Sequence, residues 1–94
     1  MYILRIEHPI FNFEEWKKAF DSDPIGREKS GVRRYRILRP VDDEKYVMID
    51  LEFATVSQAE AVLAALRVLW GRVEGTIMMN AQTRIFEAVE IVEY

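Results

Sequence analysis

The chain contains no cysteine and only one histidine, His8, among its 94 residues. The absence of cysteine excludes disulfide bonds and thiolate chemistry. A single histidine excludes metal sites built from several histidines and proton relays that need a second one. No apolar run approaches the ~20 residues of a membrane-spanning helix, so we expect no membrane segment. Residues 2–7 read as a strand that leaves no room for a signal peptide, and a cytoplasmic location is the default expectation.

Size and charge narrow the class of protein further. We expect residues 1–94 to form one small domain, because the chain is too short for two hydrophobic cores. Half of the residues are hydrophobic, which is high for this length and suggests that some apolar surface is buried between subunits. The formal net charge of -3 gives no general reason to expect nucleic acid or an anionic membrane as a partner.

Two segments rich in β-branched and aromatic residues, 32–39 and 45–53, flank the connection Pro-Val-Asp-Asp-Glu at 40–44. This arrangement predicts an antiparallel hairpin. Folding it about Asp42 gives one apolar face and one charged face, and a slip by one residue would exchange the two. The predicted opposed pairs are Tyr35–Ile49, Ile37–Val47, Arg34–Asp50 and Leu38–Tyr46.

The spacing of apolar residues predicts two helices outside the hairpin. The first covers about 13–21, with Asn12 as its N-cap. The second begins after Thr55 or Ser57 and carries an apolar stripe, and Gly71 is its expected end.

Strands at about 2–8 and 82–92 complete the order strand, helix, strand, strand, helix, strand. Helices on one face of an antiparallel sheet give a two-layer α+β sandwich, and right-handed crossovers place the first and third strands in its centre. The predicted fold is therefore ferredoxin-like. Residues 71–81, which include Met78 and Met79, receive no assignment; the two methionines could line a cavity or seal the sheet edge.

The sheet face away from the helices is predicted to be part apolar and part charged. Tyr46 and Met48 share it with Asp50, Arg34 and Arg36, and a large exposed apolar sheet is unusual for a monomer. We therefore expect a homodimer joined through this face. The alternative is a solvated face with weak surface ion pairs. In either case a carboxylate between arginines is an ion pair and a poor base.

The sequence HPIFNFEEWKKAFD at 8–21, followed by Arg27, Gly31 and the acidic turn at 42–43, resembles the dimeric α/β-barrel superfamily. In particular it resembles small bacterial proteins related to antibiotic-biosynthesis monooxygenases and stress-responsive barrel proteins. The resemblance implies a ligand cavity between helices and sheet. It leaves the reaction open, because the superfamily includes cofactor-free monooxygenases, haem-degrading enzymes, polyketide cyclases, muconolactone isomerases and proteins with no known activity.

Five residues are candidates for a site in that cavity. His8 is the candidate catalytic residue, because an unperturbed pKa near ~6.5 suits proton transfer at neutral pH; the alternative is that it fixes the turn before Pro9. Trp16, Phe20 and Trp70 are expected to contact a ligand, although aromatic residues at this spacing also serve as core. Arg27 is available to hold an anionic group. We expect no metal and no bound cofactor.

Three functions remain open on these grounds. The protein is a cofactor-independent monooxygenase-like, cyclase-like or isomerase-like enzyme acting on a small aromatic or polyketide-like compound, a non-catalytic small-molecule binding or sensing module, or a dimeric protein with a vestigial pocket. Haem degradation in related barrels uses Asn, Trp and His in that order; Asn12 and Trp70 fit, but no histidine follows. RNA binding by the same order of elements needs a glycine-containing motif on the third strand, which 46–53 lacks.

Overall fold

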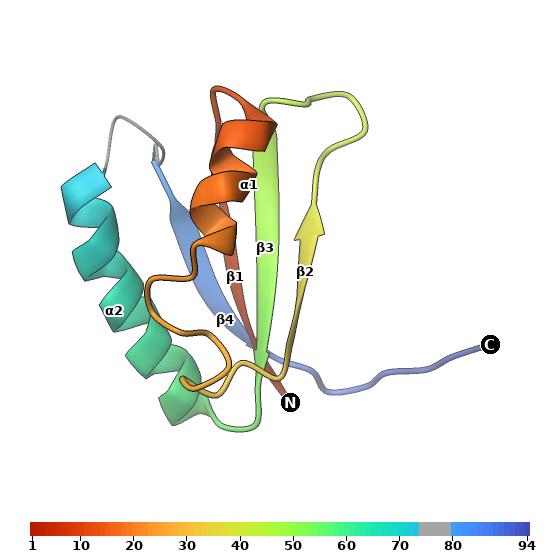
Figure 1. The fold of residues 1–94 in the computed structure, drawn as a ribbon. Coiled ribbons are helices and arrows are strands. Elements are labelled where there is room, and N and C mark those ends of the chain that lie inside the picture. Colours follow the sequence, from red (N-terminus) through yellow and green to blue (C-terminus); the bar gives the residue numbers. More distant parts are fainter. Residues whose placement is uncertain (74–79) are drawn as a thin grey trace.

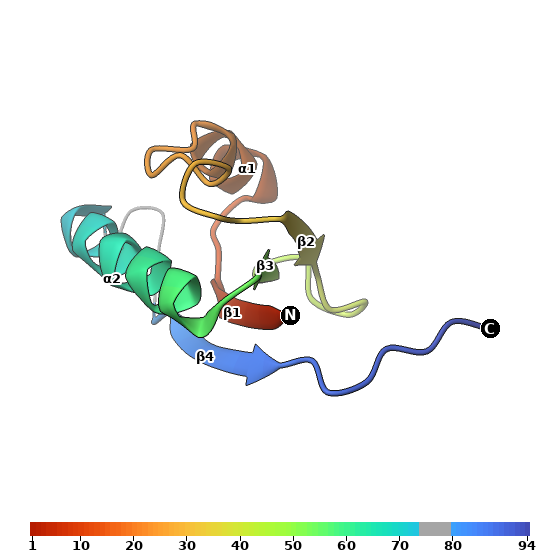
Figure 2. The same ribbon diagram turned by 90° about the horizontal axis from the view of Figure 1, so that it is seen from below.

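Six elements follow one another in the computed structural model, which describes residues 1–73 and 80–94. They are β1 (Tyr2–Pro9), α1 (Phe13–Asp21), β2 (Arg34–Leu38), β3 (Tyr46–Phe53), α2 (Val56–Val73) and β4 (Gln82–Glu87). The strands form one antiparallel sheet in the order β2-β3-β1-β4. Both helices cover the same face of this sheet (Figures 1 and 2). The predicted ferredoxin-like order is confirmed, with the first and third strands in the centre.

Both helices begin at a side chain that caps them. Asn12 Oδ1 accepts a hydrogen bond from Glu15 N at 3.0 Å, and Thr55 Oγ1 accepts one from Gln58 N at 3.2 Å. Each bond satisfies a backbone N–H that has no partner inside the helix. The predicted end of the second helix at Gly71 is wrong, because α2 continues through this residue. Glycine weakens a helix interior by only about 1 kcal/mol relative to alanine, so it permits an end without requiring one.

The core lies between the helices and the sheet. Side chains alternate along a strand, so every second residue of β1 and β3 points toward the helices. The buried core residues on these elements are Leu4, Ile6, Val47, Ile49, Leu51 and Phe53 from the sheet, and Trp16, Ala59 and Val62 from the helices.

The β2–β3 hairpin has the predicted faces but not the predicted register. Tyr35 lies opposite Leu51 and Arg34 opposite Glu52, so each partner on β3 is two residues later than expected. A shift by two residues leaves every side chain on its predicted face. The turn is fixed by Asp43, whose carboxylate accepts a hydrogen bond from the backbone N–H two residues on, at 2.9 Å. This residue lies one position later than the centre assumed for the prediction.

The last strand ends at Glu87, so the predicted strand 82–92 is too long. Its pairing with β1 runs as far as Tyr2 opposite Glu87, and Ala88 N donates to Met1 O at 3.0 Å. Residues 89–94, called here the C-terminal arm, run out beyond the sheet and away from both helices (Figures 1 and 2). Neither helix in the described ranges combines the length and apolarity needed to cross a membrane.

Candidate functional site

A cavity of about 310 Å³ lies between α1, α2 and the helix-facing side of the sheet. Apolar side chains form most of its wall, from Ile6 and Ile49 on the sheet to Leu66 on α2. The five candidate residues from the sequence all line it: His8, Trp16, Phe20, Arg27 and Trp70. The fold thus brings together residues that lie far apart in the chain. Met78 and Met79, also considered for this cavity, lie outside the described residues.

His8 is the last helix-facing residue of β1 and is fully buried. Its Nδ1 lies 2.8 Å from the carbonyl oxygen of Pro9. A carbonyl oxygen can only accept, so Nδ1 carries the proton and Nε2 of the neutral ring is left as an acceptor. Within residues 1–73 and 80–94, this buried Nε2 has no hydrogen-bond partner. The ring therefore has one satisfied nitrogen and one free lone pair.

Burial lowers the pKa of His8 below its ordinary value of 6.5, and the hydrogen bond to Pro9 opposes this shift without cancelling it. The cause is the loss of water around the charged form of the ring. The imidazole is therefore neutral near pH 7, which is the form that can take up a proton.

Aromatic rings form a continuous wall beside His8. Its ring centroid lies 6.2 Å from that of Trp16, and Trp16 stacks on Phe20 at 5.2 Å with an interplanar angle of 27°. The two α1 residues are four positions apart and so occupy the same face of the helix. Trp16 is only 5% exposed, so it serves both as core and as cavity wall.

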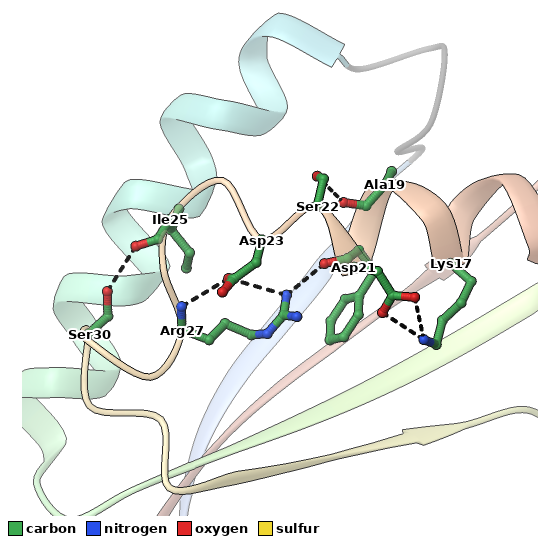
Figure 3. A network of polar contacts seen from close by, with 9 residues as sticks. Lys17, Ala19, Asp21, Ser22, Asp23, Ile25, Arg27 and Ser30 are labelled. Carbon is green, nitrogen blue, oxygen red and sulfur yellow. Dashed lines mark hydrogen bonds and ion pairs between the residues drawn. The ribbon is translucent and has the colours of Figure 1, made fainter.

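Arg27 continues this wall from the connector after α1. Its Cζ lies 3.9 Å from the ring centroid of Phe20, within cation–π distance. Nη1 donates to Phe20 O at 2.8 Å. It also lies 3.5 Å from the carboxylate of Asp23 (Figure 3). The backbone N–H of Arg27 also donates to Asp23 at 2.9 Å. These contacts hold the guanidinium at the C-terminal end of α1, where a positive charge is favourable.

Sequence reasoning missed the contribution of this connector to the cavity wall. Ser22, Pro24 and Ile25 line the cavity beside Arg27. The chain bends at Asp23, whose φ of 48° is unusual for a residue other than glycine. The Asp-Pro pair signals only a break after α1. It does not say that the following residues fold back over the cavity.

The other side of the sheet carries a different polar group, the buried carboxylate of Asp50. Arg5 donates to it through Nε at 2.8 Å and Nη2 at 2.9 Å, and Arg36 donates through Nη2 at 2.9 Å. The hydrogen bond from Arg5 lowers the pKa of Asp50 most, with a further contribution from Arg36. The predicted partner Arg34 instead pairs with Glu52. Arg5 was missed because the hairpin alone does not reveal the neighbour on β1.

Metal binding needs several ligand side chains grouped together. Among residues 1–73 and 80–94, no three His, Asp or Glu side chains are grouped as a metal site would require.

No protein-family model and no curated protein matches the chain. Solved structures do match it. SnoaB, a cofactor-independent oxygenase from Streptomyces nogalater, superposes with a TM-score of 0.75 at 12% identity, over 99% of this chain and 97% of that one. The chain therefore has the same ferredoxin-like fold as this oxygenase. The heme-degrader MhuD from Mycobacterium tuberculosis, with two hemes in its active site, matches with a TM-score of 0.67 at 21% identity, over 97% and 99% of the chains.

A third structure is a dimeric ferredoxin-like protein from an uncultured marine organism. It matches with a TM-score of 0.68 at 9% identity, over 99% of this chain and 98% of that chain. The resemblance seen in the sequence is thus confirmed for the fold. Proteins this distant share a scaffold whose chemistry is set by the residues in the site.

Proposed function

We propose that the helix-side cavity binds a small aromatic compound with a phenolic or enolic hydroxyl, and that the protein is a cofactor-independent monooxygenase-like or cyclase-like enzyme acting on it. The observation that supports this most is the buried Nε2 of His8, which lacks a partner in the described part of the chain. Leaving a buried polar atom unsatisfied costs about 1–3 kcal/mol. A ligand hydroxyl that donates to Nε2 would remove this cost.

The lining and volume of the cavity favour a small aromatic ligand. Trp16, Phe20 and Trp70 line it, and aromatic side chains pack well against an aromatic compound. A volume of about 310 Å³ is at the lower end of the ~300–1,000 Å³ range of small-molecule sites. It suits two or three fused rings better than a porphyrin. Arg27, beyond Phe20, can bind a carbonyl or anionic oxygen at the other end of such a ligand.

His8 then supplies the chemistry at the hydroxyl. Its neutral Nε2 takes the proton, leaving an imidazolium beside a phenolate or enolate. The Nδ1–H bond to Pro9 O keeps the ring in the tautomer that can accept this proton. The charged pair is held in an apolar cavity, where the attraction between opposite charges is stronger than in water. The electron-rich ring carbon of the anion can then react with dioxygen or with an electrophilic carbonyl of the same molecule.

A binding comparison tests the role of Nε2. 1-Naphthol has the hydroxyl and 1-methoxynaphthalene lacks the donor, and binding of either should change the fluorescence of Trp16 and Trp70. One hydrogen bond to a neutral acceptor is expected to make 1-naphthol bind about 5- to 10-fold more tightly. In His8→Asn the amide can still donate to Pro9 O but reaches no further, so this preference should vanish. Equal binding of the two compounds by the unaltered protein would contradict the proposal.

Turnover separates an enzyme from a binding module. Incubation with polycyclic phenols should consume dissolved oxygen or yield a cyclised product, and His8→Asn should abolish this. Binding with the expected preference but without turnover would exclude an enzyme and support a non-catalytic binding or sensing module. Failure of both compounds to bind would favour a vestigial pocket. A haem titration that gives a Soret shift lost in His8→Asn would redirect the proposal to haem.

We also propose that two copies join through the open faces of their sheets, burying Tyr46 and Met48. Leu38 and Phe86 lie on the same face and are 37% and 39% exposed, which adds to its apolar surface. Two solved neighbours are described as dimeric ferredoxin-like proteins, which supports a homodimer. Light scattering at micromolar concentrations should give twice the monomer mass. A mass near 11.1 kDa would contradict the dimer.

A further inference from the structure

We propose that Arg27 binds a carboxylate of the ligand, so that the compound taken up by the cavity is an aromatic acid. The inference rests on the proposed function in one respect, namely that the helix-side cavity holds an aromatic ligand. It does not depend on the chemistry at His8. It adds the charge that the ligand carries and the residue that recognises this charge.

Arg27 combines deep burial with weak pairing. Its side chain is 15% exposed, against 35% to 66% for the three arginines that pair with carboxylates on the open face. Arg5 donates two hydrogen bonds to Asp50, at 2.8 and 2.9 Å, whereas Nη1 of Arg27 lies 3.5 Å from Asp23. A buried charge is costly unless it is closely paired. Arg27 therefore brings to the cavity wall a positive charge that its own chain compensates only in part.

The guanidinium also keeps donors for a ligand. It carries five N–H groups in one plane, and Nη1 donates to Phe20 O at 2.8 Å. Within residues 1–73 and 80–94, Nε and Nη2 of Arg27 donate to no other residue. These two nitrogens form the edge through which Arg5 binds both oxygens of Asp50. The same edge of Arg27 thus suits a carboxylate, which can accept two parallel hydrogen bonds.

Aromatic rings hold this guanidinium in place before a ligand binds. Its Cζ lies 3.9 Å from the ring centroid of Phe20 and 5.2 Å from that of Tyr35. Phe20 is stacked on Trp16, so the cation lies at the end of a row of rings. A donor fixed in this way loses little conformational freedom on binding. The arrangement fits a ligand whose rings pack in the aromatic cavity and whose acid group reaches the end of the row.

The connector that carries Arg27 is itself hydrogen-bonded. Ser30 Oγ donates to Ile25 O at 3.1 Å (Figure 3). The connector ends at Gly31, whose φ of 100° favours glycine and where a Cβ would lie 2.8 Å from the side-chain amide of Gln58. The loop is therefore shaped by contacts at both ends, and the fold of the chain sets the position of Arg27.

A matched acid and amide test the charge. Isothermal titration calorimetry compares 2-naphthoate with 2-naphthamide, which has the same rings but no charge. The unaltered protein should bind 2-naphthoate about 10-fold more tightly, because hydrogen bonds to a charged group are about twice as strong as neutral ones. Arg27→Gln should remove this preference, and Arg27→Lys, which keeps the charge, should retain part of it.

Arg39→Gln is the control for this comparison. Arg39 also lies over an aromatic ring of α1, with its Cζ 4.5 Å from the ring centroid of Phe13, but it does not line the cavity. The preference for the acid should therefore be unchanged in Arg39→Gln. Equal binding of acid and amide by the unaltered protein, or a preference that survives in Arg27→Gln, would overturn the proposal.

Asp23→Asn tests the same charge in the opposite direction. The new amide can still accept the hydrogen bond from Arg27 N, while the negative charge beside the guanidinium is removed. The affinity for 2-naphthoate should therefore rise about 3-fold relative to that for 2-naphthamide. If Arg27 only supports the loop, Asp23→Asn should leave this ratio unchanged or lower it, and either result would contradict a bound carboxylate.

The comparison of 1-naphthol with 1-methoxynaphthalene gives an independent result for His8. If the hydroxyl preference is found but the acid preference is not, Arg27 binds no carboxylate and the proposed function stands. If the acid preference depends on Arg27 but the hydroxyl preference is absent, the cavity takes an aromatic acid and His8 is not the base. If none of the four compounds binds, both proposals fail.

Discussion

The two faces of the sheet each bury one ionisable side chain completely, but the two side chains differ in how fully their polar atoms are hydrogen-bonded. On the open face, Asp50 is 0% exposed and receives three hydrogen bonds from Arg5 and Arg36. On the helix face, His8 is also 0% exposed, but its Nε2 has no partner within the described ranges. The carboxylate of Asp50 therefore has its charge compensated within the chain, whereas the free acceptor of His8 is the feature on which the proposed ligand site rests.

This contrast arises within a single strand. Arg5 and His8 are both on β1, three residues apart, so alternation sends them to opposite faces. The open face surrounds Asp50 with charged side chains from β1 and β2, while the helix face surrounds His8 with apolar ones. The same backbone thus supports an ion-pair cluster on one side and a water-poor cavity on the other.

The largest effect is expected for the chemistry at His8. If Nε2 is the base, His8→Asn should lower turnover by roughly 10²–10⁴, the usual loss for a general base. The melting temperature should stay close to that of the unaltered protein, because the Asn amide can replace the Nδ1 donor to Pro9 O. Steady-state kinetics and a thermal melt on the same preparation check both points. Unchanged turnover with a lower melting temperature would assign His8 to the turn alone.

Trp16 is expected to dominate the stability of the helix face. Trp16→Ala should lower the free energy of unfolding by about 3–5 kcal/mol, as for other large aromatic truncations in cores. Phe11→Ala is the control, because Phe11 is 60% exposed and its loss should cost less than about 0.5 kcal/mol. Urea melts give both values. A cost below about 1 kcal/mol for Trp16→Ala would mean that the ring packs on the cavity without supporting the fold.

On the open face, Asp50→Asn should cost about 2–3 kcal/mol, since it removes a buried charge from two arginines that remain partly exposed. The hydrogen bonds from Arg5 and Arg36 lower the folded pKa of Asp50 below 3.8, although burial of the carboxylate opposes this shift. Its contribution is therefore complete above pH 3.8 and is lost as the pH falls through that lower value. The difference in unfolding free energy between the unaltered protein and Asp50→Asn should therefore shrink at acidic pH.

The control for Asp50→Asn is the exposed ion pair Lys17–Asp21, whose nitrogen and oxygen atoms lie 2.6 Å apart. Asp21→Asn should cost no more than about 0.3–0.5 kcal/mol, because water and salt screen a surface pair on a helix. Urea melts from pH 7 to pH 3 compare the variants. Similar costs for Asp50→Asn and Asp21→Asn would show that the open face is as well solvated as the helix surface.

Much of this architecture could be predicted from local patterns. Caps at Asn12 and Thr55 and the alternation along the hairpin depend on neighbouring residues, so they can be read from the sequence. Helical spacing placed Trp16 and Phe20 against the sheet, whereas the cavity itself was expected only from the resemblance to the dimeric α/β-barrel superfamily. The end of β4 could not be predicted from local patterns, because it depends on how far β1 extends beside it.

Several of the missed details are long-range, but the hairpin register is a local one. The hairpin register depends on which acidic residue forms the turn, and Asp42 and Asp43 are chemically alike. The partner of Asp50 on β1 follows from strand pairing between distant segments. That Nε2 of His8 lacks a partner is a property of everything packed around the ring, and no sequence pattern expresses it.

Nitrogen-15 NMR of His8 tests the central claim most directly, because the chain has one histidine and its ring signals need no further assignment. The account predicts a neutral ring at pH 7, protonated on Nδ1 and bare on Nε2, with a titration midpoint below 6.5. Addition of 1-naphthol should shift the Nε2 resonance, and 1-methoxynaphthalene should leave it in place. A ring protonated on Nε2, or an Nε2 signal that ignores 1-naphthol at saturation, would contradict the account.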